Sequence, residues 1–292
     1  VVVLEYLARI NLVVLIFNLV PAFPLDGGRL LQAILWPSLG YHQATRIVVF
    51  TGWIIALRQL AALEELAGEP ELAARWRRCA TELGAALVRR CWDAAAGRFR
   101  DAPGAGSAGP HSQILALIAG AAPAAAALEL LAGLLRAPHR LPIGIMFSHY
   151  LAELAAAHGC ADALAPLWER WRQPLADGFT TLPESWGLGT RSDCHAWSAH
   201  PLYHHLTATL GVMPGAPAFA SVLLRPQPED GGACAGAVPH PAGGMVRVAW
   251  RRRGEALHGQ VELPPGVPGV LRWRGRELPL PPGARQEVAL GG

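Results

Sequence analysis

A short segment late in the chain gathers the residue types that can cleave a glycosidic bond. Residues 180–186 read Thr-Thr-Leu-Pro-Glu-Ser-Trp, and residues 192–199 read Ser-Asp-Cys-His-Ala-Trp-Ser-Ala, so that Glu184 and His195 lie among indoles. A carboxylate can act as an acid or a base, and a Trp face such as that of Trp186 can stack on a pyranose ring. The structural alternative is that the Glu occupies the first turn of a helix and the Trp side chains are core.

Three segments of different character must position these residues. Residues 1–57 are strongly apolar, and residues 58–212 carry apolar side chains at three- and four-residue spacing. This spacing predicts about seven helices with no strand between them. They are a first helix ended by Gly68 and further helices near 70–92, 111–121, 124–136, 145–158, 161–174 and 196–211.

The last segment, residues 213–292, changes to short alternating runs separated by Gly and Pro. Residues 245–250, 257–263 and 270–274 each alternate apolar and polar side chains. Period two with such turns is typical of antiparallel strands. The sequence therefore predicts a mainly α chain with a β tail that forms a small antiparallel β-sandwich.

Composition narrows the classes of partner. The chain has 292 residues, of which 52% are hydrophobic and 16% are charged, and its net charge is +3. All 25 basic residues are Arg, and so small a net charge does not favour a nucleic-acid partner. The five cysteines are scattered without a Cys-x-x-Cys pair, which favours a reducing compartment over a disulfide framework.

The rhamnosidase resemblance rests on the string Thr-Thr-x-Pro-Glu-x-Trp, followed by Arg-Ser-Asp-Cys-His-Ala-Trp-Ser-Ala at residues 191–199. This pattern resembles the C-terminal half of bacterial α-L-rhamnosidases. Residues 223–227 (Leu-Leu-Arg-Pro-Gln) and the Val-x-Val-x-Trp run at 246–250 resemble the family's C-terminal β-domain. The resemblance covers about residues 58–292.

This resemblance implies part of an (α/α)₆ barrel over residues 58–212, followed by the sandwich. It also implies inverting hydrolysis of terminal α-L-rhamnose in a glycoside or polysaccharide, without a cofactor. By motif position, Glu184 corresponds to the general base, and His195 corresponds to a contact with the sugar, with Trp186 beside it. The family's general acid lies earlier in the barrel, and nothing in residues 58–179 matches it. We therefore expect an incomplete copy that lacks the acid.

The N-terminal segment carries a second resemblance. Residues 18–29 (Asn-Leu-Val-Pro-Ala-Phe-Pro-Leu-Asp-Gly-Gly-Arg) resemble the second metal-ligand motif of membrane site-two metalloproteases. The resemblance implies that Asp26 is a zinc ligand, but the sequence has no His-Glu-x-x-His to supply the others. The alternative is an Asp-Gly-Gly turn between two apolar helices of membrane type. Zinc and membrane contact through residues 1–57 are expected only under the metalloprotease interpretation.

No polar linker separates the two resemblances, whose junction falls near residues 51–57. Fused domains usually meet at a polar or Pro/Gly-rich linker. One hypothesis is therefore an inactive product of two wrongly joined genes, cut short at its start. The compartment stays open, with the cytoplasm expected for the rhamnosidase-like part and a membrane for the first segment.

Two further histidines have the spacing of metal ligands. His200 and His204 are four apart on a predicted helix and could share one face, as zinc ligands do. No Asp or Glu lies on that helix to complete a ligand set. From the sequence we expect partly buried or rim imidazoles rather than a metal site.

Overall fold

The computed structural model describes residues 41–283 and 285–291. Asp26 and the apolar segment around it lie outside these residues. The chain divides into two compact units, Val1–Leu134 and Leu135–Gly292, which are treated separately below. Among the described residues, no helix combines the length and the apolar character needed to cross a bilayer.

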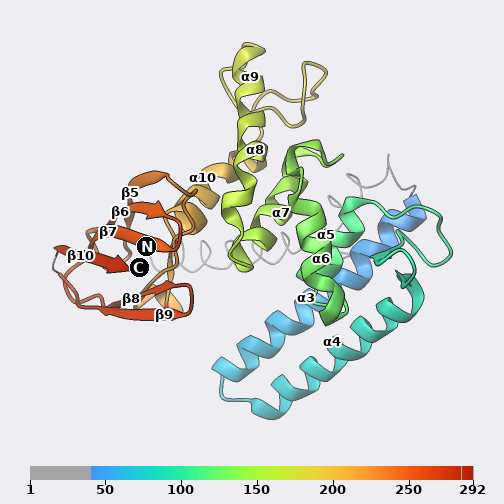
Figure 1. The fold of residues 1–292 in the computed structure, drawn as a ribbon. Helices are drawn as coiled ribbons and strands as arrows, with labels where there is room; N and C mark the ends of the chain where they lie inside the picture. Colours follow the sequence, from blue (N-terminus) through green and yellow to red (C-terminus); the bar gives the residue numbers. More distant parts are fainter. Residues whose placement is uncertain (1–40, 284, 292) are drawn as a thin grey trace, which may run out of the picture. The chain divides into compact units, whose positions relative to one another are not determined.

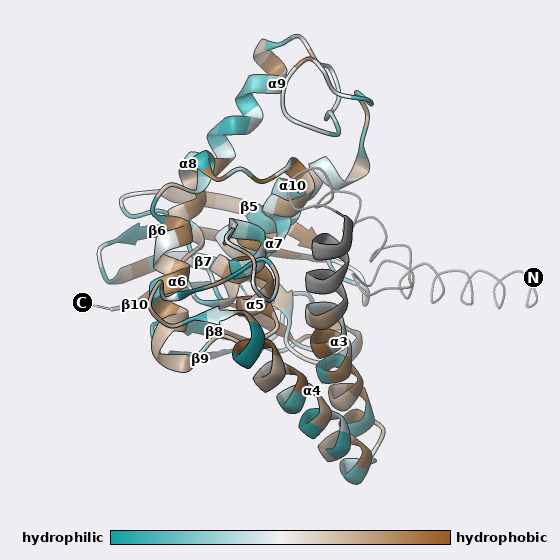
Figure 2. Ribbon diagram, turned by 90° about the vertical axis from the view of Figure 1, so that its right-hand side faces the viewer, coloured by the Kyte–Doolittle hydropathy of each residue, from teal (hydrophilic) through white to brown (hydrophobic). Residues whose placement is uncertain are grey.

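A helical hairpin dominates the described part of the first unit. It pairs α3 (Tyr41–Leu66) with α4 (Pro70–Cys91), which lie side by side (Figure 1). Gly68 turns the chain with a φ of 83°, and Pro70 occupies the first turn of α4, where its missing N–H costs nothing. Teal and brown alternate along α4 in Figure 2, as expected for an amphipathic helix that buries Ala73, Ala80 and Leu87.

The start of the first helix differs from the prediction. The sequence places this helix after residue 57, whereas α3 runs without interruption from Tyr41 through the predicted junction. Ile54 is fully buried within it, but Leu63 and Leu66 are 61% and 72% exposed. The face predicted from the leucine spacing is therefore left largely uncovered at the outer end of the hairpin.

The rest of the first unit contains strands that the sequence did not predict. Two-residue strands β1 (Trp92–Asp93) and β2 (Arg98–Phe99) form a hairpin between α4 and α5 (Pro110–Ile118), and α6 (Ala124–Leu135) ends at the boundary between the units. The carboxylate of Asp93 accepts hydrogen bonds from the backbone N–H groups of Ala95 and Ala96, which stabilises the turn. Pairing this short carries no period-two signal.

The predicted helix 145–158 closely matches α7 (Ile145–Ala157), whereas the other predicted helices of the second unit are broken into shorter pieces. The predicted helix 161–174 is broken into η2 (Ala161–Leu164), α8 (Ala165–Trp168), η3 (Glu169–Trp171) and α9 (Arg172–Ala176), after η1 (Pro138–Arg140). The predicted helix 196–211 becomes η4 (Ala196–Ala199), α10 (His200–His204) and the π-helical η5 (His205–Thr209). Pro166, Pro174 and Pro201 each remove a backbone donor, which explains the interruptions.

A β-sandwich completes the second unit, with β5, β6, β7 and β10 in one layer (Figure 1). Its first sheet has the order β10-β7-β6-β5, and its second has the order β3-β4-β8-β9. The strands are β3 (Val212–Pro214), β4 (Val222–Leu224), β5 (Ala233–Pro239), β6 (Met245–Arg253), β7 (Ala256–Glu262), β8 (Gly269–Trp273), β9 (Arg276–Leu280) and β10 (Arg285–Leu290), with the 3₁₀ turn η6 (Pro217–Phe219) between β3 and β4. The predicted antiparallel sandwich needs one correction, because β4 and β8 pair in parallel. Local alternation reveals strands but not which distant strand they join.

Trp250 anchors the sandwich core. Its side chain is 2% exposed, and its Nε1–H donates to the Leu210 carbonyl over 2.8 Å. The indole crosses Gly259 on the neighbouring strand, where a Cβ atom would lie only 2.3 Å from the ring. Glycine at this position therefore makes room for the largest core side chain.

Candidate functional site

One loop of the second unit brings Glu184 and His195 together. The Glu184 N–H donates to the Ser192 carbonyl over 2.8 Å, and the His195 N–H donates to the Leu182 carbonyl over 2.8 Å. The Thr181 hydroxyl also donates to the Asp193 carbonyl. These bonds pair the two halves of the motif side by side, although neither half is a regular strand.

An arginine of the same loop holds the Glu184 carboxylate. Arg191 donates from Nε to Oε2 over 3.0 Å and from a terminal nitrogen to Oε1 over 2.5 Å. The Glu184 side chain is 17% exposed and the Arg191 side chain is 79% exposed. This bidentate pair uses two of the roughly four acceptor positions of the carboxylate, and the other two stay open to other donors.

The His195 ring lies against Trp197, with 4.0 Å between ring centroids. Its Nδ1 is buried and has no hydrogen-bond partner within the described residues. Trp197 in turn donates from Nε1 to the Glu184 carbonyl over 3.4 Å. The imidazole is therefore fixed by packing, and its buried Nδ1 is left unsatisfied among the described residues.

A buried serine locks this segment under the loop. Ser198 is fully buried, and its hydroxyl donates to the Pro183 carbonyl over 2.6 Å. The Ser198 carbonyl accepts a hydrogen bond from Trp171 Nε1 over 3.0 Å. The residues on either side of Glu184 and His195 are thus tied to each other and to the helical core.

Trp186 is placed differently from a free stacking platform. Its Nε1–H donates to the Ile143 carbonyl over 3.2 Å, and Trp171 meets it at 84° with 4.8 Å between centroids. The Arg170 guanidinium lies 4.1 Å from the centre of its ring, a cation–π contact. A cavity of about 470 Å³ lies beside it, lined by Arg170, Glu169 and His139 among others. A sugar that stacked on Trp186 from the side of Arg170 would have to displace this arginine.

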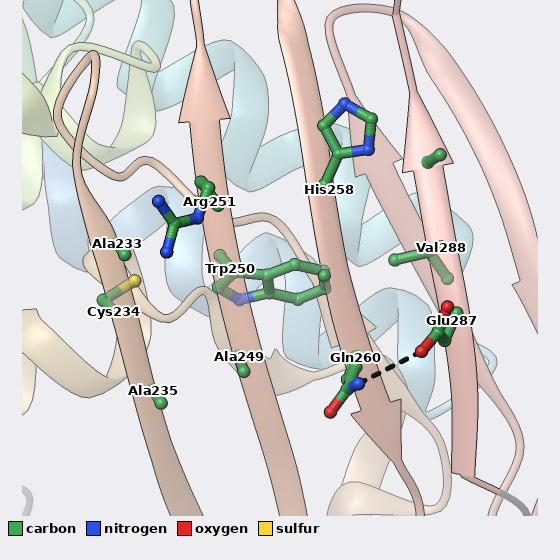
Figure 3. Close-up of a pocket in the computed structure, with 12 residues that line it drawn as sticks. Ala233, Cys234, Ala235, Ala249, Trp250, Arg251, His258, Gln260, Glu287 and Val288 are labelled. Atoms are coloured by element: carbon green, nitrogen blue, oxygen red, sulfur yellow. Dashed lines mark hydrogen bonds between the residues drawn. The ribbon is translucent and has the colours of Figure 1, made fainter.

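A larger hollow of about 690 Å³ lies on the outer face of β5, β6, β7 and β10 (Figure 3). Small side chains such as Ala235 and Ala249 form its floor, and its acidic residue Glu287 accepts a hydrogen bond from Gln260 over 3.2 Å. No second carboxylate lines it, so it lacks the acid–base pair of a glycosidase.

Asp26, the predicted zinc ligand, lies outside the described residues. The sequence provides no His-Glu-x-x-His motif to accompany it, so the residues present do not match the three-ligand zinc site of a metalloprotease.

Comparison with protein families divides the chain into three matched ranges. Residues 40–208 match the bacterial α-L-rhamnosidase six-hairpin glycosidase domain, and residues 211–289 match the bacterial α-L-rhamnosidase C-terminal domain. Residues 1–58 match peptidase family M50. The peptidase match and the six-hairpin match overlap over residues 40–58, and α3 continues from Tyr41 to beyond the end of this overlap.

Solved rhamnosidases share the fold. A family GH78 rhamnosidase of Bacillus sp. GL1 is 28% identical, with a TM-score of 0.62 over 69% of this chain and 23% of its own. The Aspergillus terreus α-L-rhamnosidase is 17% identical, with a TM-score of 0.68 over 84% and 30% of the two chains. The Streptomyces avermitilis α-L-rhamnosidase, solved with L-rhamnose, is 18% identical, with a TM-score of 0.63 over 78% and 23%. The chain thus spans about a quarter of the length of these relatives, and the fold is a helical domain followed by a β-sandwich.

Two curated relatives are zinc metalloproteases that match this chain over short stretches. A zinc metalloprotease of Methanocaldococcus jannaschii is 48% identical over 54 residues, which are 18% of this chain and 16% of the relative. A putative zinc metalloprotease of Synechocystis is 37% identical over 70 residues, which are 22% and 18% of the two chains. This likeness concerns a small part of each protein.

Proposed function

Because the chain belongs to the bacterial α-L-rhamnosidase six-hairpin glycosidase family, we propose that residues 58–292 are the base-carrying part of an inverting α-L-rhamnosidase. The observation that carries the proposal is the Glu184 carboxylate held by Arg191, with His195 on the paired half of the loop. The substrate would be a glycoside or polysaccharide that ends in α-L-rhamnose.

We take residues 58–212 as part of an (α/α)₆ barrel and residues 213–292 as the C-terminal sandwich. The exposed leucines at the outer end of the α3–α4 hairpin support this proposal, because Leu63 and Leu66 offer an apolar face that a neighbouring hairpin of a full barrel would cover. Helical hairpins bury such faces against one another.

Inversion requires a water molecule on the face of the sugar opposite the leaving group. Glu184 would accept a proton from this water while the water oxygen bonds to the anomeric carbon. At the same time the bond between the anomeric carbon and the aglycone oxygen breaks. The two hydrogen bonds from Arg191 leave acceptor positions on the carboxylate for the water. His195 would contact the sugar, and Trp186 would form part of the wall.

The general acid is the missing element. Asp93, one of the twelve carboxylates of residues 58–179, pairs with Arg100 over 2.8 Å, and this hydrogen bond, together with the one from the Ala96 backbone N–H, lowers its pKa. Asp101 accepts hydrogen bonds from Ser112 and Gly109. Because its ionised form is stabilised, Asp93 is a poor proton donor. Since nothing in residues 58–179 matches the family's acid motif, we infer that this chain holds the base without the acid.

Leaving-group dependence tests the inference. A nitrophenolate departs without a proton, so p-nitrophenyl α-L-rhamnoside should be hydrolysed faster than an alkyl α-L-rhamnoside by a chain that lacks the acid. Glu184→Gln should reduce the rate about 100-fold or more, since general base catalysis contributes that much. Glu277→Gln, an exposed carboxylate on β9, serves as the matched control.

Proton NMR of the first sugar released identifies the stereochemistry. The β-anomer is expected from an α-rhamnoside. An α-anomer, or equal rates for Glu184→Gln and Glu277→Gln, would refute the assignment of the base.

The N-terminal match supports a second candidate, a fragment of a membrane zinc metalloprotease. This candidate predicts that the purified chain contains zinc and that the zinc content falls in Asp26→Ala. An unchanged zinc content in Asp26→Ala would exclude this role.

The third candidate is an inactive product of two wrongly joined genes. The overlap of the matched ranges over residues 40–58 locates the relevant codons. One long genomic read through codons 45–65 tests it, and an uninterrupted reading frame there would rule it out.

A further inference from the structure

Three imidazoles from two helices meet in the second unit. His149 lies on α7, and His200 and His204 lie on α10. Each offers a ring nitrogen, and these three nitrogens lie within 4.8 Å of one another. His149 Nδ1 is only 3.0 Å from His204 Nε2. The cluster is therefore built by tertiary packing rather than by one helix face.

The surroundings of His200 define which nitrogen is free. Its Nε2 lies 3.1 Å from the Ile145 carbonyl and 3.0 Å from the Ser148 hydroxyl. A carbonyl only accepts hydrogen bonds, so Nε2 carries the proton and Nδ1 carries the lone pair. This Nδ1 is buried without a hydrogen-bond partner in the described part of the chain. Metal-binding histidines usually donate their other ring N–H to such a carbonyl.

His204 also has one ring nitrogen without a partner, but its other nitrogen faces an imidazole instead of a carbonyl. The residue is 2% exposed, and its Nδ1 lies 3.6 Å from a carboxylate oxygen of Glu153. That distance is too long for a hydrogen bond, so Nδ1 also lacks a partner among the described residues. Its Nε2 points toward His149. Buried nitrogens without partners destabilise a protein unless something else binds there.

The protonation states of the three rings suit metal binding. Burial and the neighbouring imidazoles lower the pKa of His200 to about 4 and that of His204 to about 3. Burial also lowers the pKa of His149. At neutral pH all three rings are therefore uncharged, which is the state that binds a metal ion.

We propose that His149, His200 and His204 together bind one first-row transition-metal ion, for which zinc is the suited probe. Imidazole suits Zn²⁺, and two nitrogens bound tetrahedrally at 2.0–2.1 Å lie about 3.4 Å apart. The widest separation of 4.8 Å must therefore shrink by about 1.4 Å, a movement within reach of side-chain rotation. Water takes the fourth position.

The ion would fasten α7 to α10 beneath the aromatic residues of the candidate site. His200 meets Trp171 edge-on at 5.1 Å, and Trp171 meets Trp186 at 4.8 Å. Trp168 stacks on His204 at 5.9 Å. The ion is thus a structural support for this wall and does not depend on the proposed hydrolase activity.

Metal titration of the full chain tests the proposal. The tag-free protein is stripped with a chelator and titrated with Co²⁺, whose visible spectrum reports tetrahedral geometry, and with Zn²⁺ against a chromophoric chelator. One equivalent per chain and a rise in melting temperature with Zn²⁺ are expected. His149→Gln and His204→Gln should weaken binding about tenfold or more.

His205→Gln is the matched control, because His205 is the next residue along the chain and is exposed. It should bind like the wild-type chain, and Asp26→Ala should as well. A stripped wild-type chain that takes up no Co²⁺ in tetrahedral form would overturn the proposal, whether or not the variants fold. Equal affinities for His149→Gln and His205→Gln would overturn it too.

Discussion

Lowering the pH should destabilise the first unit through His111. This residue lies in the first turn of α5 and is 6% exposed. Burial lowers its pKa to about 4, although nearby Asp101 acts in the opposite direction, and the ordinary value is 6.5. The positive end of the helix dipole also disfavours an imidazolium there.

The sign follows from which state binds the proton first. The unfolded chain takes up a proton near pH 6.5, and the folded chain takes it up only near pH 4. Stability is therefore fully present above about pH 6.5 and is lost as the pH falls toward 4. Between pH 7 and pH 5 the loss from this one residue is about 2 kcal/mol, from about 1.4 kcal/mol per pH unit.

Urea unfolding at pH 7 and pH 5, followed by circular dichroism with a chelator present, measures this loss. The wild-type chain should lose about 2 kcal/mol more than His111→Gln, whose amide does not titrate in this range. The control His158→Gln changes an exposed imidazole and should behave like the wild-type chain. An equal loss in wild type and His111→Gln would refute the reasoning.

Two further predictions concern packing. Gly259→Ala places a Cβ atom 2.3 Å from the Trp250 ring and should lower the free energy of unfolding by about 3 kcal/mol. The control Gly189→Ala, whose Cβ would have nothing within 4 Å, should change it by less than about 0.5 kcal/mol. Equal urea midpoints for the two variants would contradict this prediction. The side-chain amide of Gln113 accepts a hydrogen bond from the Phe99 N–H over 2.8 Å and donates one to the Phe99 carbonyl over 2.7 Å. Gln113→Ala removes both bonds and should lower the free energy of unfolding by about 2–4 kcal/mol. An unchanged thermal midpoint would exclude this effect.

Periodicity and proline position account for what the sequence predicted of the fold. The predicted helix 70–92 closely matches α4, because Pro70 marks its start and the apolar spacing continues to its end. The predicted run 245–250 lies within β6, because its alternating apolar side chains are those that face the core of the sandwich. The split of helices 161–174 and 196–211 was missed, although their prolines were visible in the sequence. The domain boundaries at residues 57 and 212 stay predictions.

Local and distant contacts explain the difference between the two site predictions. The loop with Glu184 and His195 is a local feature, since its two halves lie only 7 to 13 residues apart in the bonds that join them. The histidine cluster joins positions 55 residues apart in sequence. The spacing of His200 and His204 on one helix does not indicate that His149 lies beside them. The sequence therefore shows two of the three imidazoles of the cluster but not the third.

The local origin of the Glu184 site has a consequence for activity. Its geometry depends on Arg191, Ser198 and the backbone of the same loop. Under the proposed function, a chain without the acid would therefore keep the Glu184 carboxylate in place. Hydrolysis should then rise as the leaving group improves, and an alkyl rhamnoside should be the poorest substrate. An alkyl rhamnoside cleaved as fast as the nitrophenyl one would mean that an acid is present after all.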